Sequence, residues 1–142
     1  DDTNKPNKGA HNLVIDGCTF TGAFANPGAA IAFTDQKRGE GGSGNITIKN
    51  CVFDNTNANY IIYGHYTGDS LNGHGNFVIE NNVFKTTCYA GPIYLGRYAS
   101  NVPVVLKDNT FESVTSLAAA IYIQDHSSYG VSYDASGNTF AN

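Results

Sequence analysis

The feature that most constrains the fold of this chain is a nine-residue pattern that occurs five times. The copies read NLVIDGCTF, NITIKNCVF, NFVIENNVF, PVVLKDNTF and SYDASGNTF, and they begin at residues 12, 45, 76, 103 and 132. Each copy ends on a phenylalanine; these are Phe20, Phe53, Phe84, Phe111 and Phe140. Self-similarity at a period near 30 residues is typical of a solenoid, in which each repeat packs against its neighbours.

Each copy predicts two short strands with a tight corner between them. Apolar residues alternate with others before the corner, as Phe77 and Ile79 do, and this period of two indicates a strand with one buried face. The corner always holds a residue that tolerates positive φ. The corner residues are Gly17, Asn50, Asn81, Asp108 and Gly137. After the corner, Asn82 and Phe84 and their equivalents are expected to point inward, so that the five phenylalanines stack.

A third strand per repeat is expected at 29–33, 59–63, 91–95 and 118–123. Its predicted inward rows are Ile31, Ile61, Ile93 and Ile121, and then Phe33, Tyr63, Leu95 and Ile123. Parallel strands cannot be joined by a tight hairpin, so each strand must pair with its counterpart one repeat away. The sequence therefore predicts an all-β, three-faced parallel β-helix of four to five coils over residues 11–142. Residues 1–10 are polar and are expected to form a tail or linker.

Composition narrows the classes of partner. The net charge of −4 argues against nucleic acid as a partner. No apolar run approaches the roughly 20 residues of a membrane-spanning helix, so membrane insertion is not expected. The chain contains no methionine, which favours a processed chain or a segment of a longer protein. We expect the open strand edges at the two ends of the solenoid to be capped by end-to-end contacts or by flanking domains.

The repeat resembles a known family. The pattern Ile-x-apolar, loop, Asn-apolar-x-Ile-x-x-Asn-x-Phe is similar to the repeats of right-handed parallel β-helix proteins of the pectate-lyase-like, carbohydrate-binding and sugar-hydrolase group. The resemblance covers residues 12–142 and implies a right-handed helix with a ladder of inward asparagines at the corner. Asn82, Asn109 and Asn138 match that ladder, while Cys18 and Cys51 replace its first two rungs.

The same resemblance implies that a ligand would bind along the third strand. Aligning the repeats there places Asp35, His65, Arg97 and Asp125 in one outward row. Tyr94 and Tyr122 lie outward on the strand, and Tyr98 follows Arg97. Tyrosine rings beside charged groups suit sugar binding, because rings stack on pyranose faces while charges hold hydroxyls. The alternative is a solvated surface on which Arg97 pairs with Asp125 and the tyrosines cover the core.

The expected spacing of the carboxylates argues against catalysis and favours binding. Most glycosidases need two carboxyl groups about 5–9.5 Å apart, whereas Asp35 and Asp125 would be three strand spacings apart, about 14 Å. The paired-Asp and Gly-His-Gly motifs of the similar polygalacturonases are missing. Arg97, His65 and Asp125 remain the weak catalytic candidates for an enzyme acting on an acidic polysaccharide.

No metal site or cofactor is predicted, and Ca²⁺ is the one ion left open. The segment 54–59 (DNTNAN) is rich in oxygen ligands but lacks the EF-hand spacing, and asparagine-rich turns more often reflect turn chemistry. The cysteines have no metal-ligand spacing. Cys18 and Cys51 are expected to lie on adjacent coils, reduced and stacked.

Three functions stay open. The first is a non-catalytic module of a secreted or cell-surface bacterial protein that binds carbohydrate or a host-surface ligand. The second is a fragment of a polysaccharide lyase or hydrolase. The third is a structural adhesin stalk. All three place the chain outside the cell or on its surface.

Overall fold

The computed structural model describes residues 10–24, 28–33, 44–67, 76–97, 103–112, 119–125 and 133–141. Every regular element in these ranges is a β-strand, and none of the described residues form a helix that could cross a membrane. Asp35, Tyr98 and residues 1–9 of the expected tail lie outside these ranges. For His65, Arg97 and Asp125 the backbone is described but the side chain is not.

The strands form three sheets in which all neighbours are parallel. The first sheet has the order β1 (His11–Asp16), β4 (Gly44–Lys49), β7 (Phe77–Glu80), β10 (Val104–Lys107), β13 (Tyr133–Asp134). The second has the order β14 (Thr139–Ala141), β11 (Thr110–Glu112), β8 (Val83–Phe84), β5 (Val52–Thr56), β2 (Thr19–Ala23). The third has the order β12 (Ile121–Asp125), β9 (Cys88–Arg97), β6 (Ala58–Thr67), β3 (Ile31–Phe33).

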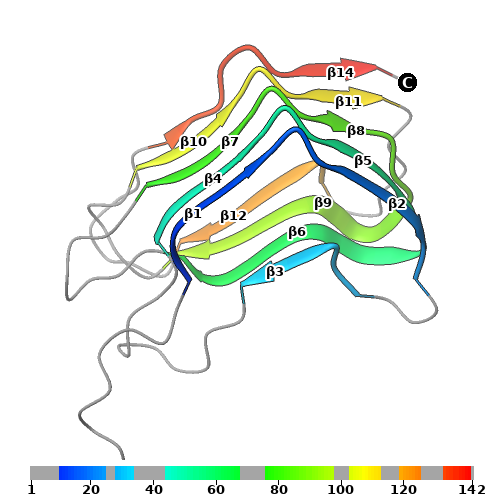
Figure 1. The fold of residues 1–142 in the computed structure, drawn as a ribbon, viewed down its shortest axis with the longest axis horizontal. Helices are drawn as coiled ribbons and strands as arrows, with labels where there is room; N and C mark the ends of the chain where they lie inside the picture. The colour runs from blue at the N-terminus through cyan, green and yellow to red at the C-terminus, as the bar shows by residue number, and fades with distance from the viewer. Residues whose placement is uncertain are drawn as a thin grey trace, which may run out of the picture.

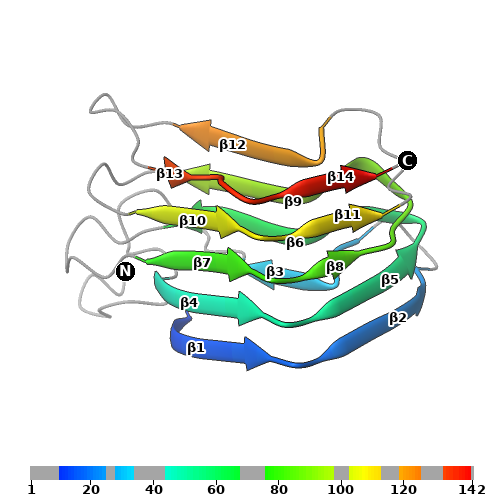
Figure 2. The same cartoon turned by 90° about the horizontal axis from the view of Figure 1, so that it is seen from above.

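The chain visits the three sheets in turn, and successive repeats lie on top of one another. Figure 1 looks along the stack and shows the three sheets as the sides of a triangle, with β1 and β2 meeting at its apex. Figure 2, turned by 90°, shows the strands of each sheet layered in chain order. The expected all-β architecture of stacked parallel repeats is confirmed, and it is consistent with a parallel β-helix.

In every repeat the chain turns from the first sheet to the second at a residue with positive φ. The values are 67° at Gly17, 53° at Asn50, 58° at Asn81, 54° at Asp108 and 71° at Gly137. Glycine adopts this conformation freely, and asparagine and aspartate adopt it more readily than other L-residues. This explains the narrow choice of residue at the corner.

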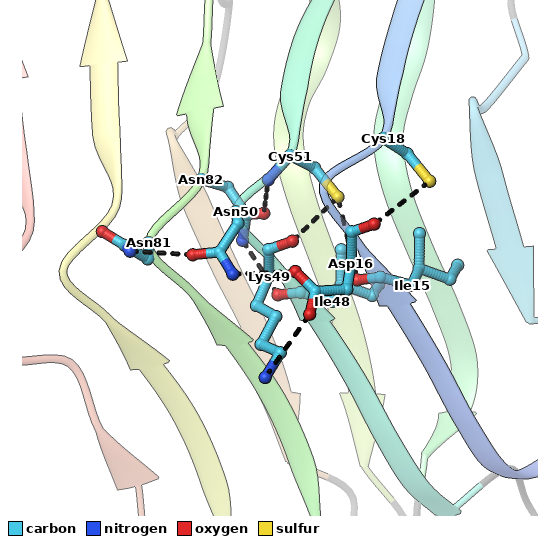
Figure 3. A network of polar contacts seen from close by, with 9 residues as sticks. All are labelled: Ile15, Asp16, Cys18, Ile48, Lys49, Asn50, Cys51, Asn81 and Asn82. Atoms are coloured by element: carbon cyan, nitrogen blue, oxygen red, sulfur yellow. Dashed lines mark hydrogen bonds and ion pairs between the residues drawn. The ribbon is translucent and has the colours of Figure 1, made fainter.

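The corner side chains also bond to one another along the stack (Figure 3). Asn50 Nδ2 donates to Asp16 Oδ1 at 2.7 Å, and Asn81 Nδ2 donates to Asn50 Oδ1 at 2.8 Å. At the last corner the Asp108 carboxylate occupies the space that a Cβ of Gly137 would need. A larger residue at position 137 would therefore have to displace the Asp108 side chain as well as adopt positive φ.

The five phenylalanines form one continuous stack through the second sheet. Phe20, Phe53, Phe84, Phe111 and Phe140 pair in register, and each ring centroid lies 4.9 Å from the next. The interplanar angles are 7–9°. Phe53, Phe84 and Phe111 are buried, whereas the terminal Phe140 is 63% exposed. The stack thus runs through the hydrophobic core and emerges at one end.

A ladder of asparagines lies beside this stack and bonds each coil to the one before it. Asn109 Nδ2 donates to the carbonyl of Ile79 at 2.9 Å, and Asn109 Oδ1 accepts the backbone N–H of Asn82 at 3.1 Å. Asn82 and Asn138 repeat the same two bonds in their own coils. Asn82 and Asn109 are almost fully buried, so these amides satisfy backbone groups that water does not reach.

The ladder weakens at its first two positions, where cysteine stands in place of asparagine. The Cys51 N–H still donates to Asn82 Oδ1 at 2.9 Å. The Cys51 thiol lies 3.8 Å from the carbonyl of Ile15, the place that Asn82 Nδ2 takes one coil further on. A thiol is a weak donor and a weak acceptor, so the contact to Ile15 is poorer than an amide hydrogen bond.

Charges alternate along the outer side of the first sheet. The last residues of β1, β4, β7 and β10 form a row in which Asp16 pairs with Lys49, Lys49 with Glu80, and Glu80 with Lys107. Lys49 Nζ lies 3.6 Å from Asp16 Oδ2. On the second sheet Lys85 Nζ lies 3.4 Å from Glu112 Oε2. Each such pair contributes little by itself because it is partly exposed, but the order of signs is kept through four coils.

The phenylalanine stack gives a direct test of the core. Replacing Phe84 by alanine removes a fully buried ring between two others and should lower the free energy of unfolding by about 3–5 kcal/mol. Phe140→Ala removes an exposed terminal ring and should cost about 1 kcal/mol or less. Chemical denaturation of both variants measures the difference, and equal costs would contradict the position of the stack.

The ladder gives a test in the stabilising direction. Cys51→Asn should supply an amide that donates to the Ile15 carbonyl and accepts the Cys18 N–H, as Asn82 does one coil further on. Completing this rung should raise the free energy of unfolding by about 1 kcal/mol. Cys51→Ser is the matched control, because one short hydroxyl group lacks the separate donor and acceptor atoms of an amide. A loss of stability in Cys51→Asn would show that the first two coils differ from the later ones.

Candidate ligand-binding face

The outer side of the third sheet carries a row of tyrosines. Strand pairing places Tyr63 of β6 beside Tyr94 of β9, and Tyr94 beside Tyr122 of β12. Ala32 of β3 continues the row past Tyr63. The side chains of Tyr63 and Tyr94 are half-buried, and that of Tyr122 is exposed. An aromatic strip therefore runs along the stack on this face.

The predicted register of β6 is wrong by one residue. Ile62, and not Ile61, pairs with Ile93, and Gly64 takes the inward row that was assigned to Tyr63. The cause is an irregularity between Ala58 and Tyr60, where β6 and β9 shift register. Ile61 and Ile62 are both fully buried, so the core accepts the shift. Its consequence is that Tyr63 joins the outward row of Tyr94 and Tyr122.

The tyrosine rings are packed against one another. The centroids of Tyr63 and Tyr94 are 5.2 Å apart with an interplanar angle of 23°, and those of Tyr94 and Tyr122 are 5.3 Å apart at 11°. Tyr60 joins the cluster, with its centroid 5.0 Å from Tyr63 and 5.2 Å from Tyr94. Tyr60 and Tyr63 are not among the predicted ligand-binding residues, since the predicted register assigns Tyr63 to the inward row and gives Tyr60 no role; the two tyrosines of NYIIY are the signal for them in the sequence.

This packing decides which parts of the rings a ligand can reach. The faces of Tyr94 are covered on both sides by Tyr63 and Tyr122, so a sugar ring cannot stack on them. Tyr122 is 45% exposed and lies on β12, which is an edge strand of the described sheet. A ligand can therefore lie across the ring edges of the row and stack on the outer face of Tyr122.

The charged row beside the tyrosines is partly assembled by the backbone. Asp125 of β12 pairs in register with Arg97 of β9, as the alignment of repeats predicts. Arg97 pairs on its other side with Thr67, and not with His65, because β6 shifts register again between Gly64 and Thr67. The structure thus brings Arg97 and Asp125 to adjacent strands and separates His65 from that register.

The asparagines of the segment 54–59 bind the chain itself. Asn57 Nδ2 donates to the carbonyl of Phe24 at 2.6 Å, and Asn57 Oδ1 accepts the Tyr89 hydroxyl at 3.0 Å. Asn55 Nδ2 donates to the carbonyl of Gly22 at 3.3 Å, while its buried Oδ1 has no hydrogen-bond partner in the described structure. Within the described residues, no three His, Cys, Asp or Glu side chains come together as a metal site. These turns link coils through amide groups.

All three cysteines are unpaired, and they differ in exposure. Cys18 is exposed, while Cys51 and Cys88 are buried. Burial raises the pKa of the Cys51 thiol, and the nearby Cys18 and Asp16 charges raise it further against opposing backbone hydrogen bonds. Burial likewise raises the pKa of the Cys88 thiol. In the folded protein at neutral pH both buried thiols are therefore protonated, and each must lose its proton before it can act as a nucleophile or a metal ligand.

Comparison of the chain with protein-family models, curated proteins and solved structures gives no match in any of the three.

Thiol reactivity should reproduce this difference in exposure. In the folded protein one thiol should react rapidly with a colorimetric disulfide reagent and two slowly, whereas all three should react at once in denaturant. Cys18→Ser should remove the fast phase, and Cys88→Ser should leave it unchanged. Only one reactive thiol in denaturant would contradict the reduced state of Cys18 and Cys51.

Proposed function

We propose that this chain is a non-catalytic β-helix module that binds carbohydrate, such as the glycans of a host surface, on its tyrosine face. The observation that carries the proposal is the row of Tyr63, Tyr94 and Tyr122 in register along one outer face. Aromatic edges and hydroxyls at a regular spacing suit an extended polymer of similar repeat, and the open side of Tyr122 suits a terminal sugar ring.

The finer form of the fold is part of this proposal. Connections between parallel strands of one sheet are right-handed in nearly all proteins, which supports a right-handed helix. Five strands in two sheets and four in the third support four to five coils. The phenylalanine stack and the asparagine ladder support membership of the pectate-lyase-like group of β-helices.

Binding is favoured over turnover by the composition of the face. The strand register places Asp125 beside Arg97, an acidic residue next to a basic one, whereas most glycosidases use two carboxyl groups. An arginine beside an aspartate can orient the hydroxyl groups of a sugar through charge-assisted hydrogen bonds. The resemblance of the repeat to pectate-lyase-like β-helices supports a place for the module on the surface of a bacterium or in a secreted protein.

A structural stalk is the second candidate, and one observation favours it. The faces of the inner tyrosines are used against each other, so part of the aromatic area stabilises the sheet and is not available to a ligand. In a stalk the tyrosine row would hold successive coils together on the outer side, as the phenylalanine stack does in the core. No ligand would bind to it.

Glycan binding by tyrosine variants tests the proposal. Tyr122→Ala removes the ring with an open face and should weaken binding at least about tenfold, which corresponds to about 1.4 kcal/mol. Tyr94→Ala should weaken binding further by breaking the row at its centre. A glycan array screened with the wild type identifies the ligand, and calorimetric titration measures the affinities of the variants.

Tyr133→Ala is the matched control, since Tyr133 is 62% exposed on β13 of a different sheet. Its affinity should equal that of the wild type. A wild-type protein that binds no glycan on the array would favour the stalk. Affinity that is unchanged in Tyr122→Ala and Tyr94→Ala would place the binding site on another face.

A further inference from the structure

Two cysteine thiols occupy equivalent positions in the first two coils. Cys18 directly precedes β2 and Cys51 directly precedes β5, and these strands pair in register from Thr19 and Val52 onward. The Val52 N–H donates to the carbonyl of Cys18 at 2.9 Å. The two cysteines are therefore separated by one strand spacing, about 4.8 Å.

The two side chains also point in the same direction (Figure 3). Cys18 Sγ lies 3.7 Å from the carbonyl oxygen of Asp16, and Cys51 Sγ lies 3.1 Å from that of Lys49. Asp16 and Lys49 are themselves paired in register. Because both thiols lie near equivalent carbonyls, we expect their sulfur atoms to be one strand spacing apart, about 4.8 Å.

In the present side-chain conformations this sulfur spacing is longer than a disulfide bond and suits a bridging metal ion. A disulfide needs sulfurs about 2.05 Å apart, so the two side chains would have to rotate away from the carbonyls of Asp16 and Lys49. An ion with two metal–sulfur bonds of about 2.3 Å on opposite sides needs sulfurs about 4.6 Å apart.

The coordination number selects the kind of ion. Structural zinc takes four ligands, and among the described residues no third His, Cys, Asp or Glu joins the two thiols. Thiolates select Cu(I), zinc and iron–sulfur clusters, and among these Cu(I) is the soft monovalent ion that suits two thiolates without further ligands. Cys18 is exposed, so an ion can reach the pair from solvent at this end of the stack.

We propose that Cys18 and Cys51 form a two-thiolate site for Cu(I). Each thiol releases its proton to solvent as its sulfur–copper bond forms, so two protons leave and the bound group carries one negative charge. Copper and sulfur keep their oxidation states. The bridge ties the first coil to the second at the two positions where the asparagine ladder is missing. The site is independent of the proposed carbohydrate face.

An anaerobic titration tests the site on the reduced full chain. Cu(I) is supplied as its acetonitrile complex in competition with a chromogenic chelator, and the protein should remove one equivalent from the chelator. Thermal unfolding should shift upward on binding, since the ion binds the folded state. Cys18→Ser and Cys51→Ser should each weaken binding on the order of 100-fold.

Two variants serve as controls. Cys88→Ser should bind as the wild type does, because Cys88 lies on β9 beside Thr86 and away from the pair. Cys51→Asn keeps the ladder and the fold, and it should lose both the copper and the thermal shift. The proposal is overturned if copper uptake survives in Cys51→Asn, or if the wild type takes up none.

Discussion

The hydrogen bonds between successive parallel strands set the distance from one coil to the next, and the rest of the structure depends on that distance. A residue that recurs at the same place in the repeat must lie against its own kind. Phe84 therefore packs between Phe53 and Phe111 at equal separations of 4.9 Å. Asn109 bonds Asn82, and Tyr94 covers Tyr122, for the same reason. The strand spacing turns a periodic sequence into columns of like side chains.

Columns of this kind differ in what they contribute. The phenylalanines remove apolar area from water, while the buried amides prevent backbone groups from being left without partners. The asparagine column is the more directional of the two, since each amide both donates to and accepts from the preceding coil. Where cysteine replaces asparagine at Cys18 and Cys51, the amide bonds of this column are lost. Other amides, such as Asn50 at the corner and Asn57 in the segment 54–59, still bond the second coil to the first.

The sequence predicted the parts of the fold that repeat without insertion. The corner at Asn81 and the inward position of Phe84 follow from a fixed spacing within the nine-residue pattern. The third strand was harder because its spacing to that pattern varies, and the doublet Ile61-Ile62 offers two registers with a buried isoleucine in each. The irregularity after Ala58 selects Ile62, and no local pattern signals it. Tyr63 was misplaced for this reason, and the tyrosine row was recognised only in part.

The alternating charges on the first sheet restrict how the number of coils can change. Asp16, Lys49, Glu80 and Lys107 follow one another in sign along their row. Removing one coil, for instance the one that contains Lys49, would bring Asp16 beside Glu80, whereas removing two adjacent coils would leave opposite charges in contact. The charge pattern of this surface therefore has a period of two coils, although the backbone pattern has a period of one.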